Sequence, residues 1–284
     1  MVASYSDQAG FRELELSRWQ KIVREYESAF RDLNQQATEP LLDAVGAGPE
    51  MRLLDVATGP GYVAAAAWKR GAAVTGIDFS PPMLAVVRQR NPAIEFVEGD
   101  AEALPFRKGS FDSLVMNFGM LHFARPEQAL AEGYRVLRPG GRIGFTVYAP
   151  PEESMGLCIT LGAVRVHGTM DVPLPEGPPF FRFSEPEECR RTLEKRGFVN
   201  PRVVKVPQVW RLPAPDALFD VMLMSTVRVA ALLRAQTLEA LRAIRKAMSD
   251  AATAYLTKDG GVELPMPAVL TSATKPADDE EKSW

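Results

Sequence analysis

Carboxylates follow three apolar runs in the first half of the chain, and the first run also carries two closely spaced glycines. Asp55 lies in the segment LLDVATGPGYVA, where a single proline separates Gly59 from Gly61. Asp78 and Asp100 end the next two apolar runs. Glycines at this spacing allow a strand to turn sharply into a helix and let the backbone approach a ligand closely. We therefore expect a ligand-binding turn that is lined by carboxylates.

A cationic ligand with hydroxyl groups suits this turn better than a pyrophosphate does. The glycines fit the dinucleotide-binding pattern G-x-G-x-x-A. However, Asp55 would repel a phosphate, and Pro60 lacks the backbone N–H that an anion would use. S-adenosylmethionine (SAM) suits the carboxylates because it offers an ammonium, a sulfonium, a ribose diol and an exocyclic amine. A SAM site is therefore our hypothesis, and an NAD(P)-dependent dehydrogenase is the alternative.

The apolar runs alternate with segments of helical periodicity, which predicts an α/β fold. Strands are expected at residues 52–57, 73–78, 94–100, 113–118 and 142–148. Helices are expected near residues 62–70, 81–90 and 126–137. Apolar strands that are separated by crossover helices form a parallel sheet with helices on both faces.

Regions with a different residue pattern precede and follow the alternating strands and helices of residues 52–148. A helical cap is expected before them, and a Pro- and Gly-rich insert, which we interpret as a lid, after them. Strands are then predicted at 200–213 and 260–275, on either side of a helical stretch at 215–256 that breaks near Gln236. The expected organisation is a cap at 1–48, a core at 49–149, an insert at 150–183, completion of the sheet at 184–275 and a disordered tail at 276–284.

The composition argues against several classes of protein. The chain has 284 residues, a net charge of −3 and no block of Lys or Arg, which argues against a nucleic-acid partner. No run approaches the ~20 apolar residues of a transmembrane helix, and the first residues lack the pattern of a secretory signal. Cys158 and Cys189 lack the spacing of a disulfide framework or a structural zinc site. We expect a cytoplasmic protein without a metal ion.

Four segments in order resemble the motifs of a known enzyme family. LLDVATGPGYVA, VTGIDFSPPML, EFVEGDAEALPFRKGSFDSLVMNFGMLHF and LRPGGRIGFTVY are similar to those of class I SAM-dependent methyltransferases. The small-molecule branch that includes the ubiquinone/menaquinone-biosynthesis type is the most similar. The resemblance covers roughly residues 50–148 and implies a Rossmann-like sheet of seven strands, mostly parallel, whose last strand is antiparallel. It also implies SAM as cofactor and S-adenosylhomocysteine (SAH) as product.

The resemblance assigns the first motif to the methionyl part of the cofactor and Asp78 to the two ribose hydroxyls. The residues of the first motif are Asp55, Ala57, Thr58, Gly59 and Gly61. Ala57 stands where the family often has glycine, which slightly narrows the turn. Other interpretations remain open, because the glycines could serve turn geometry alone and an acid after a strand often caps the next helix.

The later motifs are assigned by the same resemblance to the adenine and to the reactive methyl group. Phe79 and Met83 would cover the adenine, although Met83 could instead belong to the core. Asp100 and Ala101 would contact the adenine edge. Three further residues would lie beside the cofactor and its methyl group, namely Asn117, Phe118 and His122.

Methyl transfer from a sulfonium is an in-line displacement, so the enzyme can work by positioning its reactants and excluding water. His122 is the candidate general base, and a cofactor-lining role is its alternative. The cap is rich in apolar, aromatic and methionine side chains, which favours an apolar or aromatic small-molecule acceptor. The candidate acceptor contacts are Trp19, Tyr26, Tyr148, His167, Phe180 and Phe181. A SAM-binding scaffold or regulator without activity is the alternative from another class, and the oligomeric state, a homodimer included, stays open.

Overall fold

The computed structural model describes residues 7–277, which divide into two compact units. The sheet unit comprises residues 35–147, 178–206 and the segment that begins at 268. The helical unit comprises the segment that ends at 34 together with 148–177 and 207–267. Most of the tail predicted at 276–284 lies outside the described residues. The prediction places the cap boundary at 48 and the insert at 150–183, whereas the two units divide after residues 34, 147, 177, 206 and 267.

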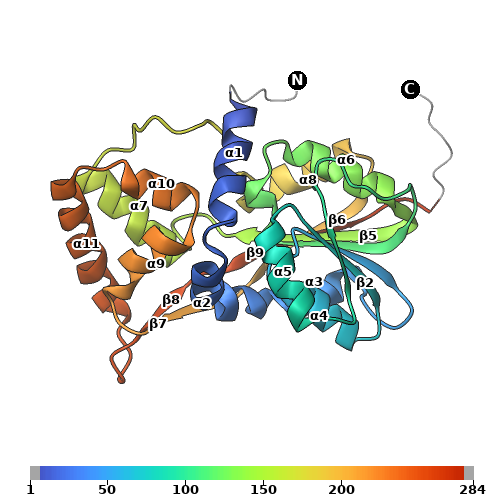
Figure 1. The fold of residues 1–284 in the computed structure, drawn as a ribbon, viewed down its shortest axis with the longest axis horizontal. Helices are drawn as coiled ribbons and strands as arrows, with labels where there is room; N and C mark the ends of the chain where they lie inside the picture. Colours follow the sequence, from blue (N-terminus) through green and yellow to red (C-terminus); the bar gives the residue numbers. More distant parts are fainter. Residues whose placement is uncertain (1–6, 278–284) are drawn as a thin grey trace. The chain divides into compact units, whose positions relative to one another are not determined.

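The sheet unit contains a seven-stranded sheet in the order β3-β2-β1-β4-β5-β9-β6 (Figure 1). Its strands are β1 (Arg52–Val56), β2 (Ala73–Asp78), β3 (Glu95–Glu98), β4 (Phe111–Asn117), β5 (Leu137–Tyr148), β6 (Val199–Val206) and β9 (Ala268–Thr274). The pairs β3–β2, β2–β1, β1–β4 and β4–β5 are parallel, whereas β6 and β9 are antiparallel. The predicted Rossmann-like sheet, mostly parallel and with an antiparallel last strand, is confirmed.

Helices cover both faces of this sheet, as the alternation of strands and helices predicted. In Figure 1, α6 (Pro126–Val136) and α8 (Pro186–Lys195) lie on one face, and α3 (Thr38–Val45) and α4 (Tyr62–Lys69) lie on the other. Helix α5 (Pro81–Arg90) packs against β3 and β2. Short 3₁₀ turns are found at η1 (Gln35–Ala37), η2 (Met120–His122) and η3 (Arg182–Ser184).

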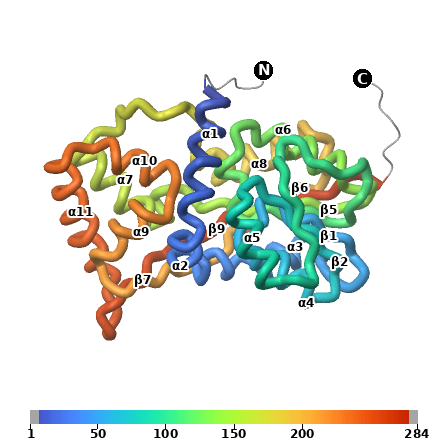
Figure 2. The backbone as a smooth tube through the Cα atoms, viewed as in Figure 1, coloured from blue at the N-terminus to red at the C-terminus, as the bar shows by residue number. Residues whose placement is uncertain are grey.

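The helical unit assembles its core from three distant segments of the chain (Figure 2). Its elements are α1 (Gln8–Trp19), α2 (Val23–Asn34), α7 (Met155–His167), β7 (Val209–Leu212), α9 (Ala217–Ser225), α10 (Arg228–Arg234), α11 (Leu238–Ala252), η4 (Thr253–Tyr255) and β8 (Val262–Pro265). The rings of Tyr26, Phe30 and Trp210 stack in succession, with centroids 5.4 and 4.8 Å apart. The Trp210 indole N–H donates to the Ala29 carbonyl at 2.9 Å.

Two predicted strands each divide into two strands of different sheets. The strand predicted at 200–213 becomes β6 and β7, and the one at 260–275 becomes β8 and β9. Pro207 and Pro267 lie at the two divisions, where a residue without a backbone N–H cannot continue a hydrogen-bonded ladder. The stretch predicted as two helices forms three, with the predicted break near Gln236 and a second break at Thr226.

Within residues 7–277, no helix combines the length and the apolar composition that are needed to cross a membrane.

Candidate functional site

The turn between β1 and α4 holds three residues in the left-handed region. The φ angles are +54° at Ala57, +51° at Gly59 and +80° at Gly61. A Cβ on Gly61 would lie 2.1 Å from the Val87 Cγ2 atom of α5, so only glycine fits there. A Cβ on Gly59 would have a single neighbour within 4 Å, the Ala57 carbonyl oxygen at 3.9 Å. The backbone at Gly59 therefore faces open space, as close approach of a ligand requires.

Asp55 holds this turn together from the end of β1. One carboxylate oxygen, Oδ2, accepts hydrogen bonds from the Thr58 hydroxyl at 2.7 Å and from the Ala64 backbone N–H at 3.0 Å. Ala64 belongs to the first turn of α4, so Asp55 joins the strand, the turn and the helix. The side chain is fully buried, and burial raises its pKa to about 7.

Asp78 at the end of β2 presents its carboxylate between two backbone N–H groups. Its Oδ2 accepts from Gly59 N–H at 2.9 Å, and its Oδ1 accepts from Ser80 N–H at 2.9 Å. Burial raises the pKa of Asp78 to about 6, although these hydrogen bonds oppose the rise. A carboxylate has about four acceptor positions, so each oxygen keeps room for a further donor. Two parallel acceptors of this kind match a ribose diol.

Asn117 and Phe118 end β4 in a conformation that Thr146 of β5 holds. The buried Thr146 hydroxyl donates to the Asn117 Oδ1 atom at 2.6 Å and accepts from Phe118 N–H at 3.0 Å. Phe118 has a φ of +57°, which is strained for a bulky residue. Because Oδ1 of Asn117 accepts this bond, its Nδ2 group remains the donor of the amide. Sequence reasoning missed Thr146, whose signal is the one threonine within the run IGFTVY.

The remaining predicted cofactor residues flank Asp78 and the end of β3. Phe79 is half-buried after β2, and Met83 is buried within α5. Asp100 follows β3, and its Oδ1 accepts from the Glu102 backbone N–H at 2.9 Å. His122 is half-buried in η2, and its electrostatic influence favours the ionised form of Asp78.

The sheet order brings these residues to one edge of the sheet unit. Strands β3, β2, β1 and β4 are neighbours and parallel, so their carboxyl ends meet at that edge. Open α/β sheets bind their ligands there. The donors and acceptors also fit SAM, because buried carboxylates suit a cation and a diol while the turn leaves its backbone accessible. The structure therefore brings together the residues predicted to bind the cofactor, all of which belong to the sheet unit.

Three of the predicted acceptor residues lie together in the helical unit. The rings of Trp19 and Tyr26 meet edge to face, with centroids 4.7 Å apart. The Tyr148 hydroxyl donates to Asn34 Oδ1 at 2.9 Å, and Asn34 Nδ2 donates to the Tyr26 hydroxyl at 2.8 Å. Burial raises the pKa of Tyr148 well above its ordinary value. Sequence reasoning missed Asn34, the residue that joins the two tyrosines.

The other predicted acceptor residues are placed elsewhere. His167 is exposed at the end of α7 and is not part of the tyrosine cluster. Phe180 and Phe181 belong to the sheet unit, where their half-buried rings meet edge to face at 5.0 Å. The next phenylalanine, Phe183, lies in η3 and packs on Phe145 of β5 at 5.8 Å.

Comparison with known proteins finds a known domain within the sheet unit. Residues 54–145 match the family described as Methyltransferase domain. The demethylmenaquinone methyltransferase of Thermus thermophilus is 48% identical over 108 residues, which are 36% of this chain and 49% of that protein. The protein of the same name from Deinococcus radiodurans is 44% identical over 169 residues, 52% of this chain and 67% of that protein. The chain thus spans about half the length of the first curated relatives that it matches.

A solved structure extends the similarity of fold. The phosphoethanolamine N-methyltransferase 2 of Haemonchus contortus, in complex with phosphomonomethylethanolamine and SAH, has a TM-score of 0.57 at 19% identity. The match covers 94% of this chain and 60% of that protein. Together with the matched domain and the curated relatives, the arrangement at the carboxyl edge shows that the chain belongs to the class I SAM-dependent methyltransferases of the ubiquinone/menaquinone-biosynthesis type.

Proposed function

We propose that this protein transfers a methyl group from SAM to an apolar or aromatic small-molecule acceptor. The observation that carries the proposal is the Asp78 carboxylate, held between Gly59 N–H and Ser80 N–H beside an accessible left-handed turn. A buried carboxylate with unused acceptor positions is costly unless a ligand supplies donors. SAM would supply a ribose diol at this point and, when bound, an electrophilic methyl group, whose leaving group, the neutral thioether of SAH, needs no acid catalysis.

The residues of the sheet unit would bind and orient the cofactor. Asp78 accepts the ribose hydroxyls, and Asp55 keeps the turn in shape through Thr58 and Ala64. Asp100 accepts a hydrogen bond from the adenine amine. Asn117, whose Oδ1 accepts from the Thr146 hydroxyl, would lie beside the cofactor at the end of β4. Orientation and water exclusion together account for up to ~7–11 kcal/mol of a barrier in favourable cases, so no general base is required unless the acceptor must lose a proton.

The helical unit would supply the acceptor contacts. Its aromatic cluster of Trp19, Tyr26 and Tyr148 offers ring faces and two tyrosine hydroxyls that Asn34 connects. Flat apolar rings with a polar edge pack well on such surfaces. The relatives' name, demethylmenaquinone methyltransferase, points to quinones as the first acceptors to test. We further propose a cytoplasmic location, which the two thiols Cys158 and Cys189 support.

Calorimetry and a turnover assay test the proposal together. SAM and SAH are expected to bind with micromolar affinity, and NAD is expected not to bind. Transfer of a labelled methyl group from SAM to reduced naphthoquinones is the expected activity. Binding of NAD without binding of SAM would contradict the proposal at the cofactor. Tight SAM binding without transfer to any aromatic acceptor would instead indicate a SAM-binding protein that lacks this activity.

A further inference from the structure

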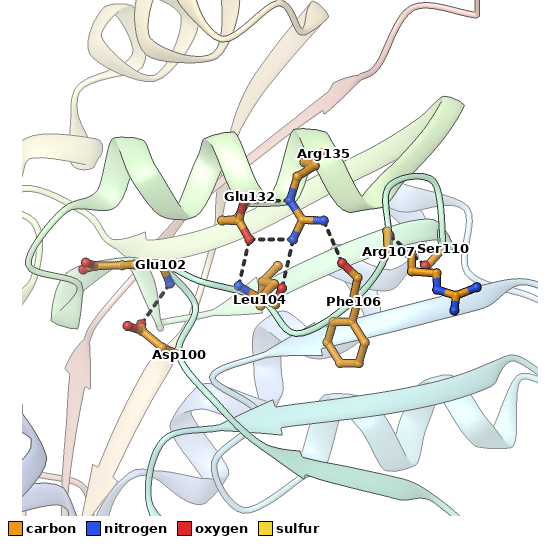
Figure 3. Close-up of polar contacts among 8 residues, drawn as sticks. All are labelled: Asp100, Glu102, Leu104, Phe106, Arg107, Ser110, Glu132 and Arg135. Atoms are coloured by element: carbon orange, nitrogen blue, oxygen red, sulfur yellow. Dashed lines mark hydrogen bonds and ion pairs between the residues drawn. The ribbon is translucent and has the colours of Figure 1, made fainter.

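Helix α6 holds the loop that connects β3 to β4, and this loop carries Asp100 (Figure 3). The Glu132 Oε2 atom accepts from Leu104 N–H at 2.8 Å, and Arg135 Nη2 donates to the Leu104 carbonyl at 2.9 Å. Arg135 Nη1 also donates to the Phe106 carbonyl at 2.6 Å. Two side chains of α6 thus form the hydrogen bonds that the backbone N–H and carbonyl groups of this loop would otherwise form within a sheet or a helix.

The two side chains of α6 also hold each other. Arg135 Nε donates to Glu132 Oε1 at 2.8 Å, and Nη2 donates to Glu132 Oε2 at 2.6 Å. The hydrogen bond from Arg135 lowers the pKa of Glu132, so the pair stays ionised at neutral pH. This two-pronged geometry fixes the orientation of both side chains, because the planar guanidinium matches the carboxylate.

A second attachment joins the start of α6 to the same loop. The buried Glu102 accepts from the Arg125 backbone N–H at 2.7 Å and from Arg125 Nε at 2.8 Å. The backbone N–H of Glu102 in turn donates to Asp100 Oδ1 at 2.9 Å. Figure 3 shows the contact between Glu102 and Asp100. Asp100 is therefore connected through Glu102 to Arg125 at the start of α6, and the loop is held at both ends of the helix.

Such a network costs desolvation energy without adding much net stability. Its consistent effect is on geometry, because a fully satisfied polar network leaves its members one arrangement. Loops that lack this support are usually mobile. We infer that Glu102, Glu132 and Arg135 are positioning residues that set where the Asp100 carboxylate meets the adenine amine of the cofactor. The inference rests on the proposed SAM site and extends it to residues that do not touch the ligand.

A ligand pair that differs at the adenine amine tests this role. SAH carries the amine, whereas S-inosylhomocysteine carries a carbonyl oxygen in its place. Calorimetry on the full chain is expected to show about a tenfold preference for SAH in the unaltered protein, since a charge-assisted hydrogen bond is lost in the analogue. Arg135→Met is expected to weaken SAH binding about tenfold while changing the affinity of the analogue by less than about threefold. The preference then disappears.

Two controls separate positioning from general stability. Arg107 is exposed on the same loop, and Arg107→Met is expected to keep the full preference. Asp112→Asn removes the carboxylate that Arg52 and Arg138 share where β4 begins, at the other end of the strands. At a similar loss of melting temperature, this variant is also expected to keep the preference. If Arg135→Met does not fold, Arg135→Lys is expected to show an intermediate preference, because an ammonium cannot reproduce the planar fork.

The outcomes are distinct. An unaltered protein that binds no SAH overturns the proposed function and this inference with it. Binding of SAH without preference over the analogue overturns the role of Asp100 and therefore the inference, but not the SAM site. A preference that survives in the folded Arg135 variants, or that is lost equally in Asp112→Asn, overturns the positioning role alone.

Discussion

The sheet unit and the helical unit build their candidate binding residues in different ways. In the sheet unit, the residues lie within one stretch, 55–122, and backbone N–H groups and strand ends set their positions. In the helical unit, the corresponding residues come from distant segments, as in the link from Tyr148 through Asn34 to Tyr26. The matched methyltransferase domain, residues 54–145, lies wholly in the sheet unit.

This difference suggests that the candidate cofactor site depends on local structure, whereas the candidate acceptor site depends on the packing of the whole helical unit. A cofactor site made of local turns and strand ends can keep its form when the rest of the chain changes. An acceptor site made of side chains from distant segments depends on the whole packing of its unit. Variants of the candidate cofactor residues in the sheet unit should therefore change cofactor affinity, and variants of the aromatic cluster of Trp19, Tyr26 and Tyr148 in the helical unit should change acceptor turnover alone.

Asp78→Asn should have the largest effect. The amide replaces one acceptor oxygen with a donor, so it cannot accept from Gly59 N–H, Ser80 N–H and a diol together. SAH affinity should fall by about 2–4 kcal/mol, measured by calorimetry. Tyr26→Phe is the matched variant in the helical unit and should leave this affinity unchanged. An Asp78→Asn protein that binds SAH within threefold of the original would remove Asp78 from the cofactor site.

Tyr26→Phe tests the role of the helical unit in acceptor turnover. The change leaves the Asn34 Nδ2 group without the hydroxyl that it contacts at 2.8 Å. The value of kcat/KM for an aromatic acceptor should fall about tenfold, while the Kd for SAH stays the same. Tyr255→Phe, in η4 of the same unit, removes a hydroxyl outside this cluster and serves as the control. Equal losses in acceptor turnover for both variants would contradict a specific role for Tyr26.

The pH dependence of SAH binding should follow the titration of Asp78 in the sheet unit. The pKa of Asp78 lies near 6 because of burial, and the diol binds to its ionised form. SAH affinity should therefore rise about tenfold between pH 5 and pH 7.5 and then level off. Since the pKa is raised from 3.8, the stability that Asp78 gives the ligand-free protein is present below pH 3.8 and is lost as the pH rises through about 6. Asp78→Asn should flatten the binding profile in calorimetry. In chemical unfolding it should only reduce the slope, because Asp55, whose pKa burial raises to about 7, still contributes over the same range.

The same difference explains what could be predicted from the sequence. The strands, the crossover helices and the cofactor edge could be predicted, because periodicity and short motifs are local signals. Thr146 and Asn34 could not, since each acts through a partner 29 or 114 positions away. The division of the strand at Pro207 has a local signal, but the assignment of β6 and β7 to different sheets depends on long-range pairing. The boundary at 34 likewise arises from packing, because helical periodicity continues across it.

Ala57 provides the finest test, because it stands where the family resemblance implies a glycine and the structure has a matching feature at Gly119. Its φ of +54° disfavours alanine, and its Cβ faces η2, where Gly119 precedes the turn. A Cβ on Gly119 would lie only 2.9 Å from that of Ala57, although the φ of −76° at Gly119 accepts any residue. The space between positions 57 and 119 therefore holds one methyl group, which Ala57 supplies while position 119 is glycine.

Exchange of that methyl group between the two positions checks this interpretation. Ala57→Gly should change the free energy of unfolding by less than about 1 kcal/mol, since relief of the left-handed strain is offset by the entropy of glycine. Gly119→Ala alone should destabilise the protein by about 1 kcal/mol through overpacking. The double variant should recover this loss, which gives a coupling energy of about 1 kcal/mol in denaturant unfolding. Additive effects would show that the two positions do not compete for the space, and the tolerance of Ala57 would then reflect the turn alone.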